Sequence, residues 1–148
     1  MKVERIENEA EVVSILSLDD PRLQKQVLDN LECTKAEWVQ GIVSMMKLNN
    51  GNFLRVYASK EKGKIKAYMI AVNAIMPPLS RYFTIVYQNF FDMENDNGEL
   101  IGREALDMVI DWAKSEGAKK IVIQTEYPRI MSQFEFKPEK GTPMVLDL

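Results

Sequence analysis

Apolar residues in the first fifty positions recur mostly every three or four residues, the spacing of a helix with one buried face. A short strand-like segment, Met1–Ile6, comes before this region. The second helical run shows the pattern well, and its apolar stripe consists of Leu23, Val27, Leu28 and Leu31. The pattern therefore predicts one strand followed by a group of amphipathic helices.

Residues that cap helix N-termini stand at the start of each of these runs. Asn, Asp and Thr side chains accept a hydrogen bond from a free backbone N–H of the first turn, and proline suits the first helical position. The capping residues are Asn8 with Glu11, Asp20 before Pro21, and Thr34 with Glu37. Three helices are expected between the first strand and Gly51.

The middle of the chain changes to the composition of strands. Phe53–Ser59 and Ile65–Ala74 flank the polar turn Glu61–Lys64 and predict a β-hairpin. Tyr82–Phe91 is rich in aromatic and β-branched residues and predicts a third strand. Three consecutive strands with short connections predict an antiparallel meander.

The last third predicts a helix, a strand and a closing hairpin. The helix has a single apolar face, formed by Ile101, Ala105, Met108 and Trp112. Lys119–Thr125 follows as a strand, and a strand–helix–strand unit places its two strands parallel. Phe134–Phe136 and Met144–Leu146 predict the final hairpin. Because no linker interrupts residues 1–148, the sequence predicts one α/β domain with a mixed sheet.

Composition narrows the range of functions. The chain has no His and one Cys, Cys33, which excludes the usual Ser-His-Asp and Cys-His nucleophiles and the usual zinc sites. A net charge of −3 with scattered Lys and Arg argues against nucleic acid as a partner. No apolar run approaches the length of a membrane span, and a lone Cys fits a reducing compartment. We expect a cytoplasmic protein without a membrane partner.

The order of the predicted elements resembles that of the GNAT superfamily of acyl-CoA-dependent N-acetyltransferases. The resemblance in sequence is concentrated in Gly98–Leu106, Gly117–Ile123 and Phe134–Pro138, followed by Met144–Leu146. The short segment between Thr125 and Phe134 is similar to that of compact, divergent members, including phage proteins. The resemblance implies a GNAT-like fold, with acetyl-CoA as co-substrate and an amine as acceptor.

In the family, backbone amides at a helix N-terminus bind the CoA pyrophosphate. The resemblance places this motif at Asn97, Gly98, Glu99, Leu100, Ile101 and Gly102, with Arg103 as the adjacent cation. Asn97 and Leu100 depart from the family pattern, which has Gln or Arg and Gly at these two positions. The resemblance also places the oxyanion donor near Phe90 and Phe91.

Acetyl transfer needs a base for the attacking amine and an acid for the departing thiolate. The family often uses a Tyr as the acid, but the equivalent position here is Met131, which carries no proton to give. Tyr127, one helical turn earlier, is the alternative acid, and the candidate base is Glu126, Asp92 or a water molecule held by either.

Two functions remain open from the sequence. The first is an N-acetyltransferase that acts on an amine of a small molecule or protein. The second is a catalytically inactive GNAT-like binding or assembly module that has lost CoA. Leu100, Met131 and the carboxylates Asp92, Glu94, Asp96 and Glu99 favour the second, and Asp96 with Glu99 would also cap a purely structural helix. A homodimer is left open.

Overall fold

The strands lie across the sheet in the order in which they occur in the chain. The computed structural model describes residues 2–76, 80–90, 97–123, 135–138, 144 and 146–148. Within them, one mixed sheet has the order β1-β2-β3-β4-β5. Its strands are β1 Lys2–Ile6, β2 Leu54–Glu61, β3 Lys64–Met76, β4 Ser80–Phe90 and β5 Lys120–Ile123. Neighbouring strands are antiparallel except β4 and β5, which are parallel, as the sequence predicted.

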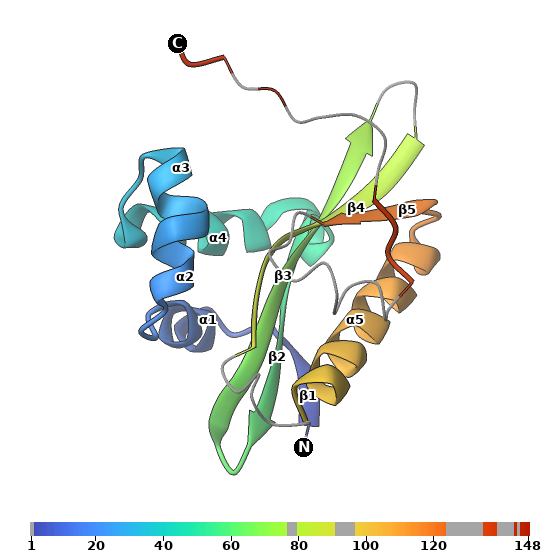
Figure 1. Ribbon diagram of the computed structural model, residues 1–148. Helices are drawn as coiled ribbons and strands as arrows, with labels where there is room; N and C mark the ends of the chain where they lie inside the picture. The colour runs from blue at the N-terminus through green and yellow to red at the C-terminus, as the bar shows by residue number, and fades with distance from the viewer. Residues whose placement is uncertain (1, 77–79, 91–96, 124–134, 139–143, 145) are drawn as a thin grey trace.

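Helices cover both faces of this sheet, as Figure 1 shows. The helices of one face are α1 Glu9–Leu16, α2 Pro21–Leu23, the π-helical turn η1 Gln24–Leu28, α3 Asp29–Leu31 and α4 Lys35–Met46, followed by the 3₁₀ turn η2 Leu48–Gly51. The other face carries α5, Asn97–Ser115. The predicted mixed α/β architecture is confirmed.

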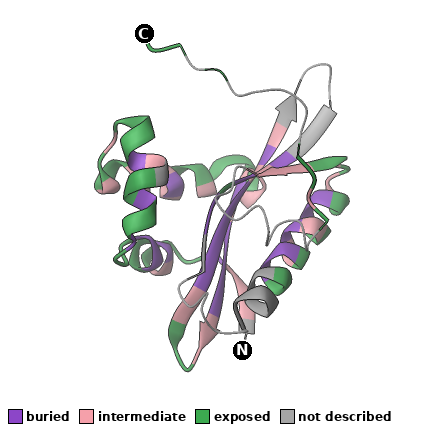
Figure 2. Cartoon of the chain, viewed as in Figure 1, coloured by how far each residue is buried: buried purple, intermediate pink, exposed green. Residues whose placement is uncertain are grey.

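Each face of the sheet has its own apolar core, and Figure 2 shows the buried stretches along the strands and the inner sides of the helices. The core under α1–α4 includes Val56, Tyr68, Ile70 and Tyr87 from the strands. The core under α5 includes Tyr57, Met69, Phe83 and Ile85. Side chains of successive strand residues point to opposite faces, so β2 and β3 supply both cores in alternation. The predicted face of α5 is confirmed at Ala105, Met108 and Trp112, which all lie in the second core.

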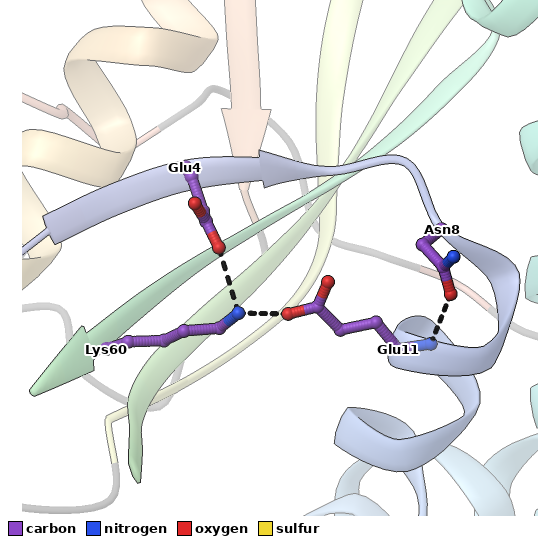
Figure 3. Close-up of polar contacts among 4 residues, drawn as sticks. All are labelled: Glu4, Asn8, Glu11 and Lys60. Carbon is purple, nitrogen blue, oxygen red and sulfur yellow. Dashed lines mark hydrogen bonds and ion pairs between the residues drawn. The ribbon is translucent and has the colours of Figure 1, made fainter. Parts of the chain in front are cut away.

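An ion-pair cluster joins the start of α1 to the sheet (Figure 3). The side chain of Asn8 accepts a hydrogen bond from the backbone N–H of Glu11, as expected of an N-cap. The Glu11 carboxylate binds Lys60 of β2, and Lys60 also donates to Glu4 of β1 at 2.8 Å. These bonds, to Glu11 and then to Glu4, raise the pKa of the Lys60 ammonium. The cluster thus connects α1, β1 and β2.

The N-terminus of α4 has a complete capping box. Thr34 accepts from the Glu37 backbone N–H at 3.2 Å, and the Glu37 carboxylate accepts from the Thr34 N–H at 3.2 Å. We expect Thr34→Ala to lower the free energy of unfolding by about 1 kcal/mol, because one helix N–H loses its partner. Urea denaturation measures the change. Ser44→Ala, in the interior of the same helix, serves as control and should be neutral or slightly stabilising.

The predicted apolar stripe of the second helix is wrong at its end. Leu23 and Leu28 are buried, but Leu31 is 60% exposed. The π-helical turn at Gln24–Leu28 is the cause, because an i→i+5 bond adds one residue to the turn and rotates the residues that follow. The same geometry closes the segment, where the Cys33 N–H donates to the Leu28 carbonyl.

Much of the predicted final hairpin lies outside the described residues, including Phe134, Val145 and the turn between the two segments. Its described residues are not in strands: Glu135 adopts a left-handed conformation (φ 70°), which interrupts an extended segment, and the Met144 side chain is 89% exposed. None of the described helices is both long and apolar enough to cross a bilayer.

Candidate functional site

The parallel strands β4 and β5 pair over a short distance only. Tyr82 to Ile85 of β4 lie opposite Lys120 to Ile123 of β5. Beyond Ile85, β4 continues to Phe90 and pairs with β3. Among the described residues, the parallel pairing therefore covers only the first half of β4.

A β-bulge occurs in β4 at the same position. Ile70 of β3 lies opposite Tyr87, whereas the next residue, Ala71, lies opposite Ile85, so Val86 has no residue opposite it. A bulge bends its strand and interrupts the regular ladder. The bulge and the last described β4–β5 pair, Ile85 with Ile123, are therefore adjacent along β4.

The bulge also reverses the side-chain alternation of β4. Phe83 and Ile85 point into the core under α5, and a regular strand would place Tyr87 there as well. Tyr87 instead lies in the core under α1–α4. Because of this one extra residue, the Tyr87 side chain points to the opposite face of the sheet from the side chains of Phe83 and Ile85.

The N-terminus of α5 lies toward the Phe90 end of β4. Trp112, near the C-terminal end of α5, packs edge-on against Phe83 with ring centroids 4.4 Å apart, and the Arg55 guanidinium lies 4.2 Å from the Trp112 ring centre. Gly117, with φ 75°, then turns the chain into β5, which starts beside Tyr82. Since α5 leads from the end of β4 back to the start of β5, its first turn lies at the end of the sheet at which β4 ends (Figure 1).

The residues predicted to bind the cofactor form the beginning of this helix. Asn97, Gly98, Glu99, Leu100, Ile101 and Gly102 are its first six residues, and Arg103 follows on an exposed position. The first N–H groups of a helix have no acceptor within it, and the helix dipole favours an anion there. Of the predicted oxyanion donors, Phe90 pairs regularly with Ala67 of β3, and Phe91 lies outside the described residues. Glu126 and Tyr127 also lie outside them.

A buried carboxylate beside the bulge is the main polar feature that the sequence did not reveal. Asp20 is only 8% exposed, and its Oδ2 accepts hydrogen bonds from the hydroxyls of Tyr87 at 2.6 Å and Tyr68 at 2.9 Å. Its Oδ1 accepts from the Leu23 N–H, so the predicted N-cap is also present. The one available signal was indirect: a tyrosine inside a buried strand needs a partner for its hydroxyl.

Burial is the largest influence on both tyrosines. It raises the pKa of Tyr68 far above the ordinary value, and the charge of Asp20 adds to this effect. Burial, followed by the hydrogen bond to Asp20, raises the pKa of Tyr87 in the same direction. Both hydroxyls therefore stay protonated and act as donors at neutral pH.

A cavity of about 450 Å³ opens on the surface beside Asp20. Residues of α2, η1 and the start of α4 line it, with the carboxylates of Asp19 and Asp20 and the ammonium groups of Lys25 and Lys35. This mixed lining gives no preference for an anion or a cation. Within the described part of the chain, no group of three His, Cys, Asp or Glu residues is arranged to hold a metal ion.

Comparison with known proteins gives structural matches alone. No protein-family model and no curated protein matches the sequence. A ribosomal-protein-alanine N-acetyltransferase from Brucella melitensis biovar Abortus 2308 matches with a TM-score of 0.68 at 10% identity, over 100% of both chains. A predicted acetyltransferase with acetyl-CoA from Clostridium acetobutylicum matches with a TM-score of 0.71 at 18% identity, over 98% of this chain and 95% of the other.

A third match shares the same architecture. It is an aminoglycoside acetyltransferase from an uncultured soil metagenomic sample, in complex with sisomicin, with a TM-score of 0.66 at 12% identity over 99% of this chain and 95% of the other. Identities this low carry the fold and leave the substrate open. In the part that the structure describes, this chain has the fold of the GNAT acetyltransferases.

Proposed function

We propose that the protein is an acyl-CoA-dependent N-acetyltransferase that moves an acetyl group from acetyl-CoA to an amine of a small molecule or protein. The observation that carries the proposal is the helix α5 between the parallel strands β4 and β5, whose first turn is directed to the end of the sheet at which the bulged strand β4 ends. The Clostridium acetobutylicum structure contains acetyl-CoA, and the aminoglycoside acetyltransferase is in complex with sisomicin. Both structures support the proposed acetyl transfer.

The chain's own backbone would supply most of the donor site. The first N–H groups of α5, from Asn97 onward, would bind the CoA pyrophosphate. Arg103, exposed at the end of the second turn, is the cation of this segment. The site thus depends on backbone donors more than on side-chain charge.

In the transfer step, the amine nitrogen attacks the thioester carbonyl carbon, a C–N bond forms, and the C–S bond breaks. A backbone N–H stabilises the oxyanion that develops during attack. We assign the base that takes the amine proton to Glu126 and the acid that protonates the departing thiolate to Tyr127. Both residues follow β5 within a few positions of the sequence, so they would be close to the C-terminal end of β5.

The alternative is a catalytically inactive GNAT-like module that has lost CoA and serves in binding or assembly. The position of Leu100 favours it, because the fourth residue of α5 carries a branched side chain where the family pattern has glycine. A side chain there keeps a phosphate away from the helix backbone. The two functions differ in one property, the affinity for acetyl-CoA.

We expect acetyl-CoA to stabilise the native protein in a thermal-shift measurement. At a ligand concentration of 100 Kd the stabilisation is about 2.7 kcal/mol, which raises Tm by roughly 5–10 °C for a chain of this size. Leu100→Gly should enlarge the ligand-induced shift, even though glycine lowers the Tm of the free protein.

Acetate at the same concentration is the control for effects of the anion alone. A wild-type protein whose Tm does not change at millimolar acetyl-CoA would refute the transferase function and favour the inactive module. A shift that is equal in the wild type and Leu100→Gly would mean that the ligand binds elsewhere.

A further inference from the structure

We propose that Asp20 is a positioning residue whose carboxylate fixes the bulged segment of β4, beside which the proposed acyl donor binds. The inference rests on the proposed function for its link to the acyl donor. Asp20, Tyr68 and Tyr87 form the group concerned, here called the Asp20 clamp. It joins three elements that are distant in the chain: the N-terminus of α2, β3 and β4.

The two tyrosines bind the same oxygen from neighbouring strands. Both hydroxyls donate to Asp20 Oδ2, and the two rings lie 5.4 Å apart at 44°. Tyr68 is 1% exposed and Tyr87 is 4% exposed, so solvent does not replace these bonds. A shared acceptor in a buried site restricts both hydroxyls to one geometry.

The position of Tyr87 gives the clamp its role. Tyr87 follows Val86 directly, so it is the first residue of β4 after the ladder to β3 is interrupted. A regular strand is held in line by its backbone hydrogen bonds, whereas a bulge needs another constraint on the direction of the segment that follows. The bond from Tyr87 to Asp20 supplies this constraint from the α1–α4 layer, opposite to the layer of α5.

Tyr68 provides a matched control within the same cluster. It donates to the same oxygen but belongs to β3, where it has a residue opposite it in each neighbouring strand, Ala58 of β2 and Asn89 of β4; a register shift lies nearby in the β2–β3 ladder, between Ser59 and Lys60. Tyr68→Phe and Tyr87→Phe each remove one hydroxyl and keep the ring. If the clamp only stabilises the fold, the two variants will behave alike. If the clamp positions the bulge, only Tyr87→Phe will change amide exchange at the bulge and the affinity for acetyl-CoA.

The test combines amide hydrogen exchange with acetyl-CoA binding. We expect Tyr87→Phe to speed exchange at the Val86 and Tyr87 amides by about tenfold, relative to exchange in the core of β2, and to raise the Kd for acetyl-CoA by about tenfold. Tyr68→Phe should change both quantities by less than about twofold. If Tyr87→Phe folds poorly, Asp20→Asn takes its place in the test. This substitution keeps the shape of the Asp20 side chain and should have the same effects on amide exchange and on the Kd.

Equal effects of the two Tyr→Phe substitutions on exchange and on Kd would overturn the clamp. So would an unchanged Kd in Tyr87→Phe when exchange at Val86 has increased, because the bulge would then not govern the donor site. If wild-type protein does not bind acetyl-CoA, the proposed function fails, and the link to the donor fails with it. The exchange comparison then decides separately whether Asp20 fixes the bulge.

Discussion

Gly102→Glu should abolish the stabilisation of the protein by acetyl-CoA. Gly102 is the sixth residue of α5, in the motif that we assign to the pyrophosphate. A new carboxylate within about 4 Å of a phosphate costs about 1 kcal/mol in bulk water and about 4 kcal/mol at the surface of a protein. The Kd for acetyl-CoA should therefore rise by roughly fivefold to a thousandfold, measured by calorimetry or thermal shift.

Gly102→Ala is the matched control for this substitution. Alanine adds no charge and has a higher helix propensity than glycine, so this variant should keep acetyl-CoA binding and gain up to about 1 kcal/mol in stability. If Gly102→Glu bound acetyl-CoA as the wild type does, the pyrophosphate would not lie at the first turns of α5. A similar loss in both variants would indicate a steric effect rather than repulsion of the phosphate.

Asp20→Ala should be among the most destabilising single substitutions in the described part of the chain. It removes the N-cap of α2, which costs about 1 kcal/mol, and it leaves the buried hydroxyls of Tyr68 and Tyr87 without their acceptor, at about 1–3 kcal/mol each. We expect the free energy of unfolding to fall by about 3–5 kcal/mol in urea denaturation at neutral pH.

Asp19→Ala is the control, because Asp19 is the exposed neighbour of Asp20 and carries the same charge. Its effect should stay within about 0.5 kcal/mol. Similar losses in the two variants would attribute the effect to net charge and would contradict the role of the buried hydrogen bonds. The triple variant with Tyr68→Phe and Tyr87→Phe should recover part of the loss, since no hydroxyl is then left unpaired.

Local signals in the sequence predicted most elements of the fold. The caps at Asn8, Asp20 and Thr34 start helices in the structure, since capping depends only on residues within one turn. The parallel pairing of β4 and β5 followed from the helix between them, which a crossover connection requires.

Features that depend on tertiary contacts could not be predicted in this way. The run Tyr82–Phe91 has strand-forming residues throughout, and nothing in it marks Val86 as the extra residue. The π-helical turn at Gln24–Leu28 is equally invisible, because the sequence there suits an ordinary helix. Burial of Asp20 depends on two tyrosines 48 and 67 positions away, and its capping role alone gave no hint of them.

The candidate site was predicted in part for the same reason. Asn97–Gly102 was assigned through its resemblance to a known motif, and the structure makes all six residues the start of α5. The roles of Glu126 and Tyr127 remain predictions. The Asp20 clamp was missed because it is assembled from a helix cap and two strand residues, each of which has an ordinary role when considered alone.

The strand order β1-β2-β3-β4-β5 has a consequence for how the chain folds. The β2–β3 and β3–β4 hairpins close short loops and can form early, since ordering them requires little loss of chain entropy. The parallel pair needs α5 to be docked before Lys120 can meet Tyr82, so it should form late. The end of β4 and the first turn of α5, where we propose that acetyl-CoA binds, would then come together only on an already folded meander, as one of the final steps of folding.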